Sequence, residues 1–152
     1  VMKERRWPGD PKSSFCDNIE SSRHLFFTCP VAKVVWRCVG MALGMDLCPN
    51  SYWQYFSWCH TFLPSGRKYY TVGPVAVCWA IWLARNRATF EKKHIKTPFE
   101  IVFSVCSFLL YWEGLQQGDG VKELRSGAAM VRSSTMSMMK MCEAARRPIE
   151  GE

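Results

Sequence analysis

The sequence predicts a mainly α fold, with a small cysteine- and histidine-containing segment at the N-terminus, about four helices, and a flexible C-terminal tail. Three observations lead to this prediction. Apolar residues recur at helical spacing in four stretches, and residues that favour helix starts precede these stretches. Residues 121–152 contain no aromatic side chain. We therefore expect a helical domain over residues 1–118 and a weakly structured tail over residues 119–152.

The first two helices are expected between residues 30 and 62. Pro30 is a favourable first helical residue, and Gly44 is suited to the stop that follows. The apolar face of this first helix is Val31, Val34, Val35, Cys38 and Ala42. Asn50 or Ser51 caps the second helix, whose aromatic stripe runs from Tyr52 to Phe62.

The third and fourth helices are expected between residues 74 and 116. The third begins near Pro74 and runs past Glu91. Its predicted apolar face comprises Val75, Cys78, Trp79, Trp82 and Phe90. The fourth begins at Thr97-Pro98-Phe99-Glu100, which combines a capping-box Thr and Glu with proline at the first helical position. Its predicted apolar face comprises Ile101, Val105, Phe108, Leu109 and Trp112.

The composition changes after residue 118. The segment that follows contains a methionine cluster and Ser133-Ser134-Thr135. This composition fits either a loose amphipathic helix or a disordered tail, and we favour the weakly structured form. If the segment folds on a partner, its methionines would provide an adaptable apolar surface.

The charge of the chain is modestly positive. Its 152 residues include 20 Lys and Arg against 13 Asp and Glu, a net charge of +7. From residue 119 onward there are six Lys and Arg against five Asp and Glu, so the first 118 residues carry +6. This surplus is compatible with RNA, DNA or another acidic partner but is too small to require one.

The eight cysteines indicate free thiols rather than a disulfide framework. The start VMKERRWP has no apolar stretch of the secretory type behind it, and several cysteines lie inside hydrophobic runs. We therefore expect an intracellular protein, nuclear or cytoplasmic. No run reaches the ~20 apolar residues of a spanning helix, so no stable membrane span is expected.

One segment contains residues with metal-binding chemistry. Cys16, His24 and Cys29 form the pattern C-x7-H-x4-C immediately before a predicted helix. Thiolate and imidazole are ligands that zinc prefers, and a structural zinc site uses four of them. A C-x2-C pair would place the fourth ligand at Ser13, which is a poor ligand. The alternative is two free cysteines and a surface histidine.

No catalytic constellation is evident in the sequence. There is no Asp-Asp pair of the polymerase type, no acidic set suited to two-metal chemistry, and no Ser-His-Asp arrangement. We therefore expect a protein that is not an enzyme and has no catalytic residues.

The same segment carries a resemblance to a known family. The run FCDNIESSRHLFFTCPVAKVVW (15–36), with WPGD (7–10) before it, resembles the zinc-binding region of plant non-LTR, or LINE-type, retrotransposon reverse transcriptases. The stretch CWAIWLARNRATFEKKHIKTPFEIVFSVCSFLLYWEGLQ (78–116) is similar to the polypeptide that follows this region in those elements. The resemblance covers residues 5–118.

The resemblance implies a truncated C-terminal region of such a polymerase, with a zinc-knuckle-like segment over about residues 13–30. It implies that Cys16, His24 and Cys29 are zinc ligands, while Ser13 replaces the first cysteine of the family motif. The function it implies is a non-catalytic module that binds nucleic acid as an appendage to a reverse transcriptase. The alternative is a stand-alone protein of the same origin that acts through protein–protein interaction, with a degenerate metal site.

Several residues are candidates for contact with nucleic acid because they are cationic or able to stack on bases. They are Arg5, Arg6, Trp7, Arg23, Arg85, Arg87, Lys92 and Lys93. The alternative is that these cations lie on ordinary solvated helix faces. Trp79, Trp82 and the aromatic stripe of the second helix are expected in the core rather than in a base-stacking surface.

Overall fold

The computed structural model describes residues 11–46, 48–62, 72–115 and 120–146. In these ranges the chain is helical, with five α-helices and a short π-helical turn, and it contains no β-strand. The predicted mainly α fold is therefore confirmed. The candidates Arg5, Arg6 and Trp7 lie outside the described residues.

The elements of the N-terminal half hold the cysteine- and histidine-containing segment in place. The π-helical turn η1 (His24–Thr28) leads into α1 (Pro30–Ala42), and α2 (Tyr52–Phe62) follows. Pro30 begins α1 as predicted, and Gly44 adopts the positive φ of 69° that favours glycine after a helix. Trp36 is fully buried, and its indole N–H donates to the carbonyl of Phe26 at 2.7 Å, which ties α1 to η1.

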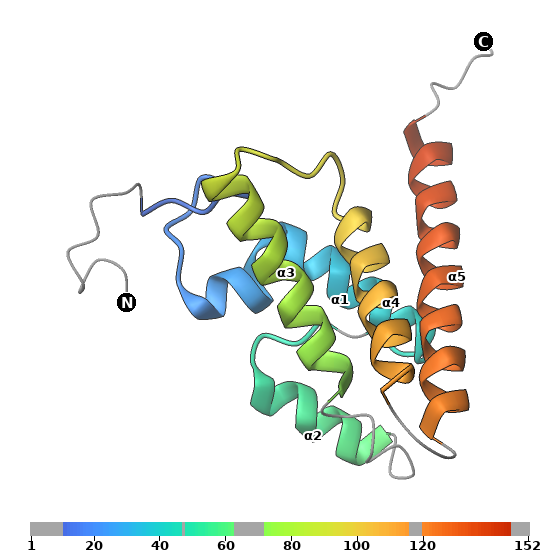
Figure 1. Cartoon of the computed structure of the whole chain (residues 1–152). Helices are drawn as coiled ribbons and strands as arrows, with labels where there is room; N and C mark the ends of the chain where they lie inside the picture. The colour runs from blue at the N-terminus through green and yellow to red at the C-terminus, as the bar shows by residue number, and fades with distance from the viewer. Residues whose placement is uncertain (1–10, 47, 63–71, 116–119, 147–152) are drawn as a thin grey trace.

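Helices α3 (Val72–Phe90) and α4 (Phe99–Glu113) run antiparallel beside this support (Figure 1). The Glu100 carboxylate accepts the backbone N–H groups of Lys96 and Thr97 at 2.9 and 3.3 Å, the glutamate half of the predicted capping box. Ile101, Val105 and Leu109 of α4 are buried as predicted. Helix α3 ends before Glu91 because Lys92 adopts a left-handed φ of 56°.

The predicted apolar face of α3 is largely wrong. Cys78 is buried, but Val75, Trp79, Trp82 and Phe90 are exposed, and the buried residues include Ala76, Val77, Ala80 and Ile81. The first thirteen residues of α3 have no charged side chain, so periodicity could not identify the inward face. The small side chains of Ala76 and Ala80 face inward, where they leave room for neighbouring helices to approach closely.

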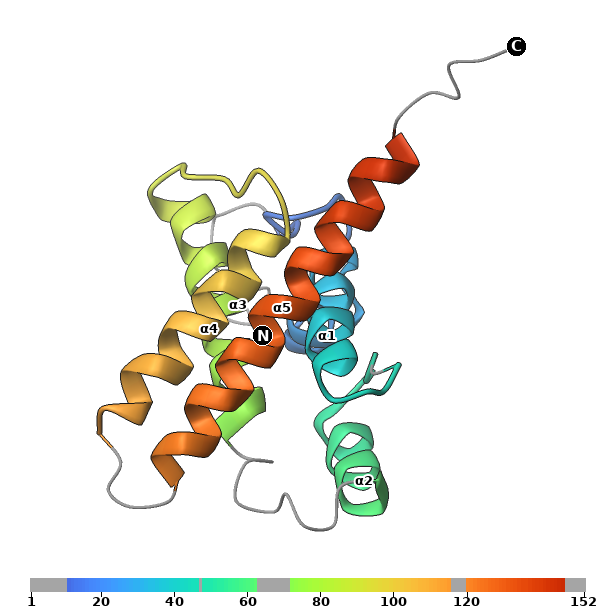
Figure 2. The same ribbon diagram turned by 90° about the vertical axis from the view of Figure 1, so that its right-hand side faces the viewer.

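The weakly structured tail predicted over 119–152 is also wrong for most of its length. Helix α5 (Gly120–Arg146) packs mainly on α4 and also on α1 (Figure 2). Leu124, Ala128, Val131 and Thr135 are buried on one face, at alternating spacings of four and three residues. Cys38 of α1 contacts Met138 of α5, with 3.5 Å between the sulfur atoms, and burial raises the pKa of the Cys38 thiol to about 11.

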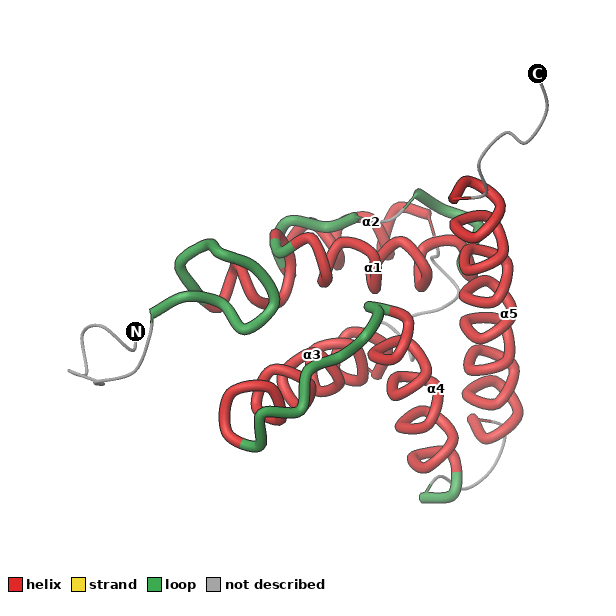
Figure 3. Tube along the Cα trace, turned by 90° about the horizontal axis from the view of Figure 1, so that it is seen from above, coloured by secondary structure: helices red, strands yellow, loops and turns green. Residues whose placement is uncertain are grey.

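Viewed from above, α5 lies along one side of the molecule, next to α1 and α4, and the loop that carries Cys16 lies at the opposite side (Figure 3). Arg125 of α5 forms an ion pair with the buried Glu113 of α4, which adds a polar contact to this helix pair. No helix among the described residues is both long and apolar enough to cross a membrane.

The buried face of α5 gives a first testable prediction. Leu124→Ala removes a side chain that is 7% exposed and should lower the free energy of unfolding by about 2–5 kcal/mol. Urea unfolding followed by circular dichroism measures this loss. Met141→Ala, at a position that is 65% exposed, is the matched control and should have little effect. Equal stability of the two variants would contradict the docked helix.

Candidate metal centre

A closed loop positions the first candidate ligand. Lys12 pairs with Ile19 in an antiparallel bridge, and the backbone N–H of Ser13 donates to Asn18 at 2.9 Å. The N–H of Glu20 donates to the carbonyl of Pro11 at 2.9 Å and closes the base of the loop. Cys16 therefore lies near the tip of a loop with a defined shape.

The π-helical turn positions the other two ligands. Ser21 accepts the backbone N–H of His24 at 3.0 Å, where the helical turn begins. The N–H of Cys29 donates to the carbonyl of His24 at 2.8 Å, which is the five-residue hydrogen bond of a π-turn. Cys29 then adopts an extended backbone and precedes Pro30, the first residue of α1. The widened turn and the start of α1 thus bring His24 and Cys29 to the same side.

The three candidate ligands converge. One ligand atom from each of Cys16, His24 and Cys29 lies within 4.8 Å of the other two. The Cys16 Sγ is 3.1 Å from the His24 Nε2, and the other ring nitrogen, Nδ1, is 3.4 Å from the Thr28 hydroxyl. A hydrogen bond to the second ring nitrogen is the usual way of orienting a metal-binding histidine. The group can hold a metal ion, and its two sulfurs and one imidazole fit a borderline-soft cation.

Burial changes the acidity of one ligand. It raises the pKa of the Cys29 thiol above its ordinary value, and the nearby Cys16 thiol acts in the same direction. The backbone N–H groups of Val31 and Ala32, at the start of α1, lower it. Burial has the largest effect, so Cys29 is a neutral thiol at neutral pH until a cation replaces its proton.

Ser13 belongs to the same loop but has another hydrogen-bonding role. Its side chain is largely buried, and its Oγ accepts the backbone N–H of Phe15 at 3.2 Å. Among the described residues, no fourth His, Cys, Asp or Glu joins the group of three. With the described residues alone, water or a non-acidic group would have to complete the coordination of a metal held here.

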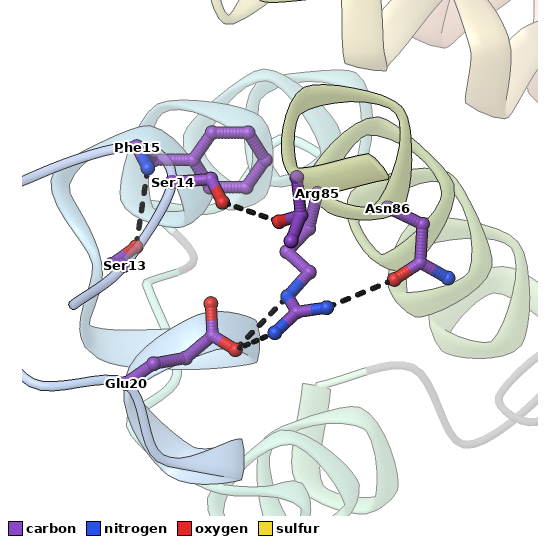
Figure 4. Close-up of polar contacts among 7 residues, drawn as sticks. Ser13, Ser14, Phe15, Glu20, Arg85 and Asn86 are labelled. Atoms are coloured by element: carbon purple, nitrogen blue, oxygen red, sulfur yellow. Dashed lines mark hydrogen bonds and ion pairs between the residues drawn. The ribbon is translucent and has the colours of Figure 1, made fainter. Parts of the chain in front are cut away.

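A buried ion pair fastens this loop to α3 (Figure 4). The Arg85 Nε and Nη2 atoms both donate to the Glu20 Oε1, at 2.9 and 2.7 Å, and the Arg85 Nη1 donates to Asn86. The two charged side chains are only 7% and 11% exposed. Nearby, the Ser14 and Thr89 hydroxyls are 2.6 Å apart, so a second polar contact joins the loop to the same end of α3.

This geometry removes Arg85 from the predicted nucleic-acid contacts. Its guanidinium is buried against Glu20 and cannot reach a phosphate without breaking the ion pair. Glu20 was not among the predicted site residues because 65 positions separate it from Arg85, and no local pattern links them. The one sequence feature that could have pointed to Glu20 is its position between Cys16 and His24.

The other described cationic candidates are exposed. Arg23 donates to the carbonyl of Asn50 at 3.3 Å. Arg87, Lys92 and Lys93 lie at the C-terminal end of α3 and just beyond it, and Lys93 pairs with Glu91 at 3.0 Å. These three cations share one end of a helix, whereas Arg23 is placed beside the candidate metal group.

Two tryptophans predicted in the core lie at the surface instead. Trp79 and Trp82 are 47% and 42% exposed, and their rings stack with centroids 5.1 Å apart. Trp79 also meets Phe108 of α4 edge-on, and Phe108 stacks on Trp112. We call these four residues the aromatic ladder. In α2 only part of the predicted stripe is buried: Tyr55 is inside and Phe62 is exposed.

Comparison with known proteins does not assign the chain to a family. No protein-family model matches the chain, and no curated protein or solved structure shows significant similarity to it.

The Glu20–Arg85 pair gives a second prediction. Glu20→Gln removes the carboxylate charge that faces the buried Arg85 guanidinium and should lower the free energy of unfolding by about 3–5 kcal/mol. The double variant Glu20→Leu/Arg85→Met removes both charges and should recover much of this loss. Chemical denaturation of the three proteins measures the difference. A double variant as unstable as Glu20→Gln alone would contradict this account.

The acidity of Cys29 gives a third prediction. Because burial raises the pKa of this thiol, Zn²⁺ must displace its proton at neutral pH, and affinity should increase as pH rises from 6 to 8. The proton that zinc displaces from Cys29 contributes a dependence of up to about tenfold per pH unit. Competition with a chelator of known zinc affinity measures it. Cys29→Ser should reduce this slope, and a pH-independent affinity of the parent chain would contradict the prediction.

Proposed function

We propose that the chain is a non-catalytic zinc-binding module, derived from a retrotransposon reverse transcriptase, that binds nucleic acid. The observation that carries the proposal is the convergence of Cys16, His24 and Cys29 within 4.8 Å. These residues come from a closed loop, a π-turn and the start of a helix, and a metal ion would join all three segments. The resemblance of residues 15–36 to the zinc-binding region of plant elements supports the identity of the metal.

Zinc is favoured by the chemistry of the donors. Two thiolates and an imidazole match the ligands of structural zinc sites, whereas magnesium and calcium prefer oxygen ligands. Bound zinc would serve as a structural crosslink. The Glu20–Arg85 ion pair would then connect the crosslinked loop to α3.

Nucleic-acid binding is supported by exposed cations near the module. Arg23, Arg87, Lys92 and Lys93 remain candidates, and each phosphate that a cation neutralises releases counterions. For a single strand, four contacts correspond to a slope of about −3 in a plot of log affinity against log salt concentration. Binding of this kind would be weak and strongly dependent on salt.

The aromatic ladder favours the alternative function, protein–protein interaction by a stand-alone protein with a degenerate metal site. Exposed tryptophans are enriched at protein interfaces. The α3 segment 72–84 and the α4 segment 101–112, which carry the ladder, contain no charged side chain. This face therefore has no cation of its own for a phosphate backbone. Under this alternative, partner binding depends on the ladder and is insensitive to zinc.

One experiment tests the proposal and gives the fourth prediction. Protein purified under reducing conditions should contain about one zinc per chain, and its affinity for single-stranded RNA or DNA should fall steeply with salt. Cys16→Ala and His24→Ala should lose the metal and weaken nucleic-acid binding. Cys142→Ala, at an exposed cysteine outside the group, is the matched control. Metal content is measured by elemental analysis and affinity by fluorescence anisotropy at several salt concentrations.

Ser13→Cys provides the complementary arm of this experiment. Adding a third thiolate should raise zinc affinity by at least about tenfold if position 13 faces the metal. Chelator competition on the variant and the parent chain measures the change. The proposal fails if the parent chain contains no zinc and shows no salt-sensitive binding.

A further inference from the structure

A cleft separate from the metal centre lies between α3 and α4. Its volume is about 450 Å³, within the range of ~300–1,000 Å³ that is typical of small-molecule sites. The walls are the C-terminal half of α3, the connection that follows it, and the first turns of α4. In Figure 1 this connection arches over the ends of both helices.

Backbone hydrogen bonds fix both ends of this connection. At its start, the left-handed Lys92 turns the chain away from the helix axis, and the N–H of Lys93 donates to the carbonyl of Arg87 at 3.1 Å. At its end, the Glu100 carboxylate holds the N–H groups of Lys96 and Thr97. These hydrogen bonds give the connection a defined shape, and it forms one wall of the cleft.

The floor of the cleft is apolar. Ala80 and Ile101 are buried, and Leu83, Ala84 and Ile95 are half-buried around them. The two alanines of α3 leave space that larger side chains would fill. A flat hydrocarbon group can replace water over this floor with a gain in free energy of roughly 25 cal/mol per Å².

The polar rim offers one cation that other side chains do not neutralise. Lys93 is paired with Glu91, and Glu100 is engaged by backbone N–H groups. Across the part of the chain that the structure describes, the Arg87 guanidinium has neither an ion pair nor a side-chain hydrogen bond. A guanidinium binds a carboxylate through two parallel hydrogen bonds. Because two carboxylates also line the cleft, a monoanion suits it better than a dianion.

We propose that this cleft binds a small organic carboxylate, with its apolar body on the Ala80–Ala84 and Ile101 floor and its carboxylate on Arg87. None of the three candidate metal ligands lines this cleft, but it shares Arg87 and Lys93 with the proposed nucleic-acid contacts. It assigns to Arg87 a role in selecting the anionic group and to the alanines a role in admitting the apolar body.

The fifth prediction tests this site on the full chain with 2-naphthoate as the probe. Calorimetric titration should show binding that Arg87→Gln weakens by at least about tenfold, since a charge-assisted hydrogen bond contributes on that order. Arg37→Gln, at an exposed arginine of α1, is the matched control and should bind like the parent chain. The neutral 2-naphthamide and the dianionic 2-naphthyl phosphate should bind more weakly than 2-naphthoate.

A second variant tests the floor. Ala84→Phe fills the cleft and should abolish naphthoate binding, with circular dichroism used to confirm that the helices are retained. Equal naphthoate affinity for the parent chain and Arg87→Gln would overturn the proposal, as would tighter binding of the naphthyl phosphate. Binding that survives in folded Ala84→Phe would place the probe on the aromatic ladder and would also overturn it.

Discussion

The buried ion pair between Glu20 and Arg85 is the contact on which the arrangement of the N-terminal segment depends. In the loop over residues 11–20, Phe15 and Cys16 pack against the core only in part, so polar contacts complete the docking of the loop on the helices. Two hydrogen bonds from one guanidinium to one carboxylate oxygen define both its position and its orientation. A buried ion pair adds little net stability relative to an apolar pair, so its main contribution here is to specify one docked geometry.

The docked position of this loop brings Cys16 close to the other two candidate ligands. His24 and Cys29 are held locally, by the π-turn and by the start of α1, and would stay near each other without the loop. Cys16 is different, because only the fold of the loop and its attachment to α3 bring its sulfur within 3.1 Å of the imidazole. Glu20, four residues after Cys16 and four before His24, therefore acts as the link between the ligands and the helical body. The same link couples any metal bound at the group to the end of α3 that carries Arg87.

Local features of the fold could be predicted from the sequence, and long-range ones could not. Pro30 and the Thr97–Glu100 motif marked helix starts because capping is a property of a few adjacent residues. The spacing of Cys16, His24 and Cys29 identified the candidate ligands for the same reason. Arg85 was misassigned because its burial depends on a partner 65 residues away. Trp79 and Trp82 were misplaced because α3 is apolar on all sides in this region. Helix α5 was missed because its buried face mixes Ala128 and Thr135 with Leu124 and Val131, which gives a weak apolar pattern.

Helix α3 carries two surfaces of different chemistry, one cationic and one aromatic and uncharged. Its C-terminal end carries Arg87 and leads into Lys92 and Lys93, and it contacts the loop that carries Cys16 through Arg85 and Thr89. Its earlier turns carry Trp79 and Trp82 on a face without charge. If a metal joins Cys16, His24 and Cys29, its removal would act first on the loop and on the Glu20–Arg85 pair that leads to the cationic end, and less on the aromatic ladder. Nucleic-acid binding that requires a metal at Cys16, His24 and Cys29 would therefore operate through the cationic end, whereas protein binding by the aromatic ladder would not require that metal.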